Sequence, residues 1–313
     1  MAAAGERADY RWTFVVLSAA TASFSLMQSM VSPVLPLLQR ELHTSQNTVT
    51  WVLTAYLLAA SVFTPILGRV GDMIGKEKVY VVTLLVLVVG TAVAALANSI
   101  GVMIVGRALQ GAGGGIIPLS FGIIRDEFPR AKIAGAIGTL SAMLSVGGGL
   151  GIVLAGPVVH ALGYRWLFWI PGAFSLCGAI AAHFFIPESP IRTPGKINFF
   201  AAGLLSAWLV ALLIGVSEAP TWGWESGKVL GLFAAAAVLL LLWIAVELRS
   251  AQPLIDMRMM RIHAVWTANL VAFLFGMGLY SMFAFLPEFL QTPKSAGYGF
   301  GASVTESLSL IHI

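Results

Sequence analysis

Long stretches without charge are the feature that most constrains this chain. Nine stretches of at least 17 residues contain no Asp, Glu, Lys or Arg, and the longest lies between Lys132 and Arg165. A helix needs about 20 apolar residues to cross a bilayer, and only a helix or a closed barrel satisfies its backbone amides there. The stretches are too long for barrel strands. We therefore expect an all-α polytopic membrane protein.

The apolar runs between charges and turn residues place the spans. We expect them at 12–38, 50–68, 79–97, 101–124, 133–160, 166–186, 198–216, 229–247 and 264–290. Charged residues make up only 10% of the chain, against about 25% in soluble domains. With nine spans of about 20 residues each, too little chain remains for a soluble catalytic domain.

Several classes of partner find no support in the sequence. The net charge of +4 comes from basic residues scattered among loops, and nucleic-acid binding needs a contiguous basic patch. Cys177 is the only cysteine, and the five histidines have no metal-ligand spacing. No nucleophile is paired with a base at membrane depth. We expect no enzyme, no cofactor, no metal and no nucleic-acid partner, and we expect the lipid bilayer to surround the protein.

The distribution of basic residues sets the orientation. If the N-terminal segment 1–11 lies inside the cell, thirteen of the 18 Lys and Arg residues fall on the cytoplasmic side. Four fall on the opposite side, and Arg107 lies within a span. Because cytoplasmic loops carry the excess of positive charge, this predicts a multi-pass protein of the cell membrane with a cytoplasmic N-terminus.

The segment GRVGDMIGKEKV lies between the second and third predicted spans. Its residues Gly68, Asp72 and Gly75 are expected in a very short cytoplasmic turn that ends at Lys76. Glycine permits the tight reversal. Asp72 can accept hydrogen bonds from helix N-terminal amides and pair with a basic neighbour. It is either a latch that breaks and reforms as helices rock, or a helix cap; the spacing does not separate the two.

The fourth span contains an arginine in the segment GRALQGAGGGIIP. Arg107 and Gln110 are one turn apart on a similar face, and Gly111 and Gly115 form a GxxxG pair. A guanidinium near the bilayer centre costs roughly 2.5–3.5 kcal/mol on insertion scales, so Arg107 is expected to face a watery cavity or a carboxylate. A structural ion pair, or snorkelling to the interface, remains the alternative.

The fifth span repeats small residues. Gly147, Gly151 and Ala155 follow one another at every fourth position, which favours close helix contact. Gly156 and Pro157 follow, and because proline lacks a backbone donor we expect a kink there.

Together these motifs resemble the major facilitator superfamily, in particular its fourteen-span drug/proton antiporter branch related to bacterial multidrug exporters. Three segments carry the resemblance most strongly: GRVGDMIGKEK, RALQGAGGG and GGGLGIVLAGP. TWVLTAYLLA, RWLFWIP and SEAPTWGW are also similar to this branch, and the resemblance runs from about residue 12 to 306.

The resemblance implies a domain organisation. Residues 12–186 would form an N-terminal six-helix bundle, 187–248 a linker with two extra membrane helices, and 249–306 the start of a C-terminal bundle. About nine of an expected fourteen spans would then be present, in a C-terminally truncated chain. The last residues, LSLIHI, resemble a translated sequencing adapter, so we expect 307–313 to be a non-native tail.

The resemblance also implies a function, namely a secondary active transporter that exports hydrophobic or amphipathic compounds in exchange for protons by alternating access. It assigns roles to three groups of residues. These are a cytoplasmic gate (Gly68, Arg69, Asp72, Gly75, Lys76), a proton-coupling group (Arg107, Gln110, Gly111) and a flexible antiporter helix (Gly147, Gly151, Gly156, Pro157).

Departures from the branch leave two alternatives open. Met27 stands where the first span of the branch often has an acid, and Ser32 where it has an asparagine. The alternatives are a facilitator of another small solute without proton antiport, and a membrane sensor or scaffold that does not transport.

Overall fold

The computed structural model describes residues 10–189, 192, 195 and 198–302, and this part of the chain is helical with no strand. The predicted tail 307–313 and most of the N-terminal segment 1–11 lie outside it. The α-helices are α1 Tyr10–Val31, α2 Leu35–Glu41, α3 Gln46–Ile74, α4 Lys76–Ala95, α5 Ile100–Gly111, α6 Ile116–Glu127, α7 Arg130–Leu162, α8 Trp166–Phe185, α9 Phe199–Trp222, α10 Gly227–Arg249 and α11 His263–Gln291.

The described helices confirm an all-α polytopic fold. Eight helical segments within the described residues are long and apolar enough to cross a membrane. The first joins α1 and α2 through a short 3₁₀ turn, and the fourth joins α5 and α6 in the same way. At the ninth predicted span, 264–290, α11 forms a helix whose stretch His263–Gly278 counts as a shorter apolar helix.

Several helix boundaries differ from the predicted spans because capping residues, rather than hydrophobicity, set them. Ser45 accepts a hydrogen bond from the backbone N–H of Thr48 and starts α3 four residues before the predicted position. Ser99 caps α5 and Ser226 caps α10 in the same manner. A serine oxygen satisfies one of the amides that have no partner in the first turn, so the helices extend past the apolar runs into the interfaces.

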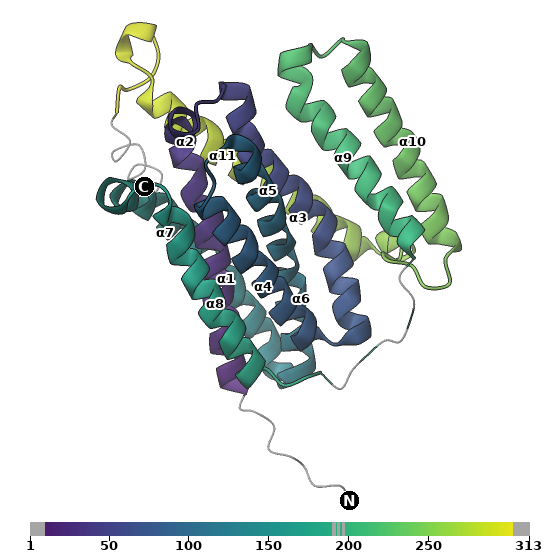
Figure 1. Cartoon of the computed structure of the whole chain (residues 1–313). Coiled ribbons are helices and arrows are strands. Elements are labelled where there is room, and N and C mark those ends of the chain that lie inside the picture. The colour runs from purple at the N-terminus through teal and green to yellow at the C-terminus, as the bar shows by residue number, and fades with distance from the viewer. Residues whose placement is uncertain (1–9, 190–191, 193–194, 196–197, 303–313) are drawn as a thin grey trace, which may run out of the picture.

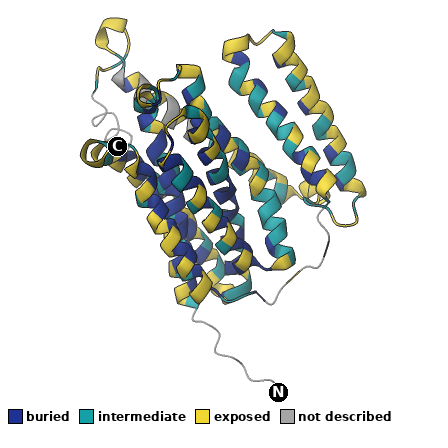
Figure 2. Ribbon diagram, in the orientation of Figure 1, coloured by how far each residue is buried: buried dark blue, intermediate teal, exposed yellow. Residues whose placement is uncertain are grey.

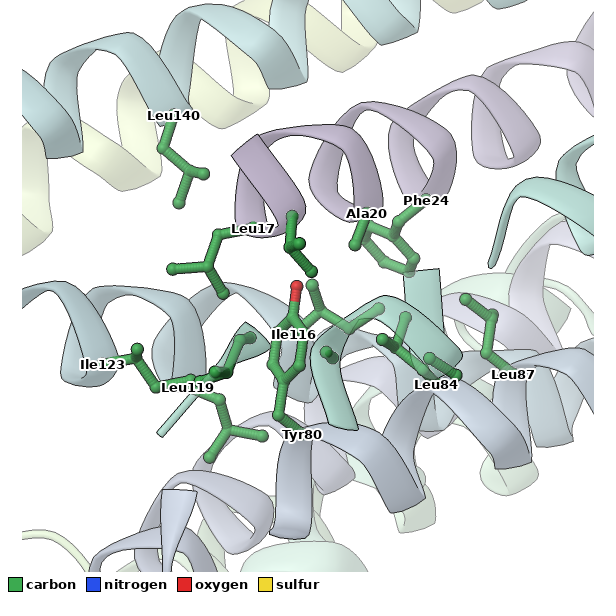
Figure 3. Close-up of a cluster of buried hydrophobic side chains, with 14 of the residues drawn as sticks. Leu17, Ala20, Phe24, Tyr80, Leu84, Leu87, Ile116, Leu119, Ile123 and Leu140 are labelled. Atoms are coloured by element: carbon green, nitrogen blue, oxygen red, sulfur yellow. The ribbon is translucent and has the colours of Figure 1, made fainter. Parts of the chain in front are cut away.

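α1 and α3–α8 pack into one bundle (Figure 1). α1 packs against α7 and α8, α3 against α5, and α4 against α5 and α8. Figure 3 shows the buried cluster at the centre, where the ring of Tyr80 lies among leucines and isoleucines that include Leu17 and Ile116. Both of these side chains have no exposed surface.

α9 and α10 lie outside this bundle. α9 and α10 form an antiparallel pair beside α3, and α9 contacts α3 whereas α10 packs on α9 (Figure 1). Figure 2 shows that buried residues concentrate in the bundle, while this pair is largely exposed on its outer faces. Large apolar side chains such as Phe174, Phe184 and Leu241 are more than half exposed, as expected for helices whose outer faces meet lipid.

Candidate functional site

A cluster of charges lies where α3 ends and α4 begins. Lys76, the first residue of α4, reaches Asp72 in the last turn of α3 with Nζ–Oδ1 3.0 Å. It also reaches Asp126 near the end of α6, with Nζ–Oδ2 2.8 Å. The side chains of Lys76 and Asp126 are 4% and 2% exposed, whereas that of Asp72 is 37% exposed. Lys76 therefore joins three helices through one buried and one accessible ion pair.

The turn between α3 and α4 consists of Gly75 alone. Its φ of 125° is one that a residue with a side chain rarely adopts. A Cβ at Gly75 would also lie within 2.0 Å of the carboxylate of Glu188, from the segment that follows α8. Glu188 therefore sits directly against the start of α4, where helix amides favour a negative charge.

The structure changes the expected position of the acidic residue in this segment. α3 continues to Ile74, so Gly68, Arg69 and Asp72 lie within the helix and not in the turn. Asp72 is near a helix C-terminus, and the residue before α4 makes no side-chain cap. The helix-cap interpretation of Asp72 is therefore wrong, and its contact is the ion pair with Lys76.

An open cleft of about 410 Å³ adjoins the charge cluster. Gly68 and Asp72 line it from α3, Gly122 and Arg125 from α6, and Ile133 from α7. Because Asp72 borders this cleft, its ion pair with Lys76 is open to competition from a further group that enters there.

Among the side chains that the structure describes, that of Arg107 is the largest with no exposed surface. Its Nε donates to the backbone carbonyl of Val52 on α3 at 2.9 Å. Its Nη1 donates to Oε1 of Gln110 at 2.7 Å, and its guanidinium carbon lies 4.5 Å from the centre of the Tyr56 ring. The charge is therefore held by a carbonyl dipole, an amide and an aromatic face.

The network continues from α5 into α4 and α1. Gln110 donates through Nε2 to the hydroxyl of Thr91 at 3.1 Å. That hydroxyl donates to the carbonyl of Leu87 at 2.7 Å and lies 3.2 Å from the sulfur of Met27. Met27 is fully buried, so this departure from the resemblance places a neutral thioether at the end of a polar chain.

The predicted surroundings of Arg107 differ from the observed ones. Within the described residues no carboxylate lies at ion-pair distance from it, and its side chain does not face water. Its Nη2 has no hydrogen-bond partner in this part of the chain. A buried charge without an opposite charge is expensive, so the neutral dipoles around Arg107 are what make its position tolerable.

Small residues in the fourth span permit close packing on α3. A Cβ at Gly111 would lie 2.4 Å from Cβ of Ala59, and one at Gly115 would lie 2.6 Å from the side chain of Leu67. Between α5 and α6, residues Ala112–Gly115 form a 3₁₀ turn within the span, a feature that often marks a hinge.

The fifth span, α7, approaches α1 equally closely. Cβ atoms at Gly147 and Gly151 would lie 2.4 Å and 2.5 Å from backbone carbonyl oxygens of α1. Gly156 has no atom within 4 Å of its Cβ position, and Pro157 lies inside α7, which continues to Leu162. Gly147 and Gly151 thus belong to the helix contact, whereas Gly156 and Pro157 are outside it.

Sequence reasoning missed several residues at these two sites. Asp126 is next to Arg125 in sequence and resembles an ordinary interface charge, and Thr91 is unremarkable within an apolar helix. Ser189 donates to Asp126 at 2.8 Å from a segment 63 residues away. No local signal marks these residues, because each is selected by a contact between helices far apart in the chain.

No group of three or more His, Cys, Asp or Glu residues in the described ranges could hold a metal ion.

Comparisons with known proteins place these features in a family. The profile of the Major Facilitator Superfamily matches residues 17–311. The chain is 32% identical over 254 residues to the multidrug transporter protein MdtP of Bacillus subtilis, covering 78% of this chain and 46% of that protein. It is 28% identical over 251 residues to the tetracenomycin C resistance and export protein of Streptomyces glaucescens, covering 80% and 47%.

Solved structures share the fold at lower identity. The tetrameric PepTSo2 superposes with a TM-score of 0.59 at 17% identity, covering 90% of this chain and 62% of that one. The human organic anion transporter MFSD10 gives 0.53 at 19% identity, covering 71% and 59%. The chain spans about half the length of the curated relatives it matches. It is a multi-pass membrane protein, related to transporters rather than enzymes, and belongs to the Major Facilitator Superfamily.

Proposed function

We propose that the full-length protein is a secondary transporter of the cell membrane that exports hydrophobic or amphipathic compounds in exchange for protons by alternating access. The N-terminus would be cytoplasmic, residues 12–186 one bundle, 187–248 a linker with two helices and 249–306 the start of the second bundle. The observation that carries the proposal is the fully buried Arg107, whose polar partners come from α3 and α5, with Gln110 linking it onward to Thr91 on α4.

A charge in this position is costly in a protein that only needs to fold. It has a use in a protein whose helices exchange partners during a cycle, and Gln110 and Gly111 would serve the same proton-coupling step. The names of the relatives, a multidrug transporter and an export protein for tetracenomycin C, support the substrate class.

The gate would be the Asp72–Lys76 pair with its neighbours Gly68, Arg69 and Gly75. Lys76 keeps its buried partner Asp126 when the accessible pair with Asp72 opens, so the positive charge is never left without a counter-charge. In α7, Gly147 and Gly151 would slide against α1, while Gly156 and Pro157 would let the helix bend.

One observation favours a second candidate. Met27 places no carboxylate beside the network, as expected for a facilitator that moves a small solute without proton antiport. A sensor or scaffold that does not transport would have no use for either polar site.

Efflux from an efflux-deficient bacterial host that expresses the full-length protein tests the proposal, with a panel of amphipathic dyes and a proton uncoupler. Exchange with protons predicts that the uncoupler restores dye accumulation. Uncoupler-insensitive transport would favour the facilitator, and no transport of any compound would favour the sensor or scaffold.

A further inference from the structure

α3 has two polar connections at almost the same height, one on each side. On its inner side, the carbonyl of Val52 accepts the hydrogen bond from Arg107 at 2.9 Å. On its outer side, the indole N–H of the adjacent Trp51 donates to Oε1 of Glu218 on α9, also at 2.9 Å. The two neighbours in sequence thus join the helix of the buried arginine to the helix pair outside the bundle.

A second contact extends the outer connection. The hydroxyls of Thr54 on α3 and Ser217 on α9 lie 3.4 Å apart. Trp51 and Thr54 are three residues apart and so share a face of α3, and they meet two consecutive residues of α9. Polar pairs between helices are specific contacts in lipid, where apolar surface alone does not select a partner.

α9 carries this connection for the whole helix pair. α10 packs mainly on α9. Gly215 of α9 lies close to α10, because a Cβ there would lie 2.8 Å from the ring of Phe233. Whatever fixes α9 to α3 therefore fixes both helices to the bundle.

We propose that the face of α3 formed by Trp51 and Thr54 is the docking site of the α9–α10 pair, and that Glu218 is a positioning residue for Arg107. The pair moves with the first bundle as one body, and Glu218 holds Trp51 so that the carbonyl of Val52 stays aimed at the guanidinium. The proposal deepens the proposed function, because it rests on the role assigned to Arg107.

Cross-linking tests the docking without any substrate. Thr54→Cys and Ser217→Cys are combined with Cys177→Ser in the full-length protein, in native membrane vesicles, and are oxidised with copper phenanthroline. A disulfide is expected in nearly all molecules, to the same extent with and without an imposed pH gradient. Single-cysteine variants are the controls. Absence of the cross-link, or a cross-link that appears only under one condition, would overturn docking as one body.

Hydrogen–deuterium exchange tests the positioning, again without substrate. Glu218→Ala is expected to speed exchange about fivefold or more, the factor for one lost hydrogen bond of about 1 kcal/mol, in α3 around Val52 and in α5 around Arg107. Glu218→Gln keeps an acceptor for Trp51 and should match the wild type. The control Glu225→Ala removes the same charge from an exposed site in the α9–α10 loop. If exchange in Glu218→Ala changed only in α9 and α10, the role of Glu218 would be local to that pair, which would contradict the proposal.

Transport separates this inference from the proposed function. With ethidium as the probe in inverted vesicles, Glu218→Ala and Trp51→Phe should each lower the maximal rate and leave KM unchanged, and the double variant should be no worse than either. Full transport activity of Glu218→Ala, with hydrogen–deuterium exchange around Arg107 as slow as in the wild type, would contradict the positioning role. A wild type that moves no ethidium under a proton gradient would count against export of lipophilic cations, and the first two experiments would still decide the inference.

Discussion

Arg107 Nε lies 2.9 Å from the carbonyl oxygen of Val52, 55 residues earlier in the chain. The bond ties α5 to α3 inside the bundle, and the other partners of the guanidinium, Gln110 and Tyr56, are also neutral. The buried charge is thus stabilised by dipoles and an aromatic face in place of an acid. Its environment is sensitive to any change in those neutral groups.

Removal of the amide partner should destabilise the protein. Gln110→Ala takes away the acceptor of Arg107 Nη1, and a hydrogen bond to a charged group is worth about 1.5–3 kcal/mol. Unfolding of the purified protein in detergent measures the loss. Gln46→Ala, at an exposed position in the first turn of α3, should change stability by no more than about 0.5 kcal/mol. Equal stability of the two variants would show that the amide does not hold the charge.

Loss of Lys76, which lies between two acids, should destabilise the protein far more than loss of Lys78. Lys76→Met leaves Asp126, 2% exposed, with only the distant pair to the exposed Arg125 at 3.7 Å, and breaking a buried pair costs up to about 3–5 kcal/mol. Lys78→Met removes a pair with Glu188 in which the lysine is 62% exposed, worth about 0–1 kcal/mol. Thermal unfolding in the same detergent ranks the two, and a larger effect at Lys78 would contradict the assignment of the buried pair.

The spans could be predicted from the sequence, whereas the partners at the two polar sites could not. Charge-free stretches report the thickness of the membrane, so every predicted span is helical in the structure, two of them as a pair of helices joined by a 3₁₀ turn. Arg107 stands out because an arginine in hydrocarbon is rare. The partners of Asp126, Thr91 and Glu188 are brought to them by segments that are distant in the chain and pack together in the bundle. Their identity as partners depends on tertiary contacts, which no local pattern encodes.

The single-residue turn at Gly75 should not tolerate a side chain. Gly75→Ala must place a Cβ at a φ of 125° and against the carboxylate of Glu188, and backbone strain of this kind costs about 1–3 kcal/mol. Gly101→Ala adds a methyl group on α5 where no atom lies within 4 Å, and should be neutral or slightly stabilising. The yield of folded protein and its melting temperature distinguish the two, and a Gly75→Ala variant with unchanged yield and melting temperature would contradict a strained backbone at this turn.

The close contact between α1 and α7 should require a glycine at position 147 of α7. Gly147→Ala would push a methyl group to within 2.4 Å of the Ala22 carbonyl oxygen, and overpacking typically costs about 1–3 kcal/mol. Gly138→Ala, in the same helix with open space around it, is the matched control. Unfolding measurements should show a loss for the first variant only, and an equal response would mean that α1 and α7 are not in close contact.

The role of Arg107 in transport is tested by efflux from an efflux-deficient host that expresses full-length Arg107→Ala, normalised to the amount of protein in the membrane. We expect the variant to reach the membrane but to export no more than a host without the protein, for every compound that the wild type exports. Export at the wild-type rate by this variant would contradict the role of Arg107.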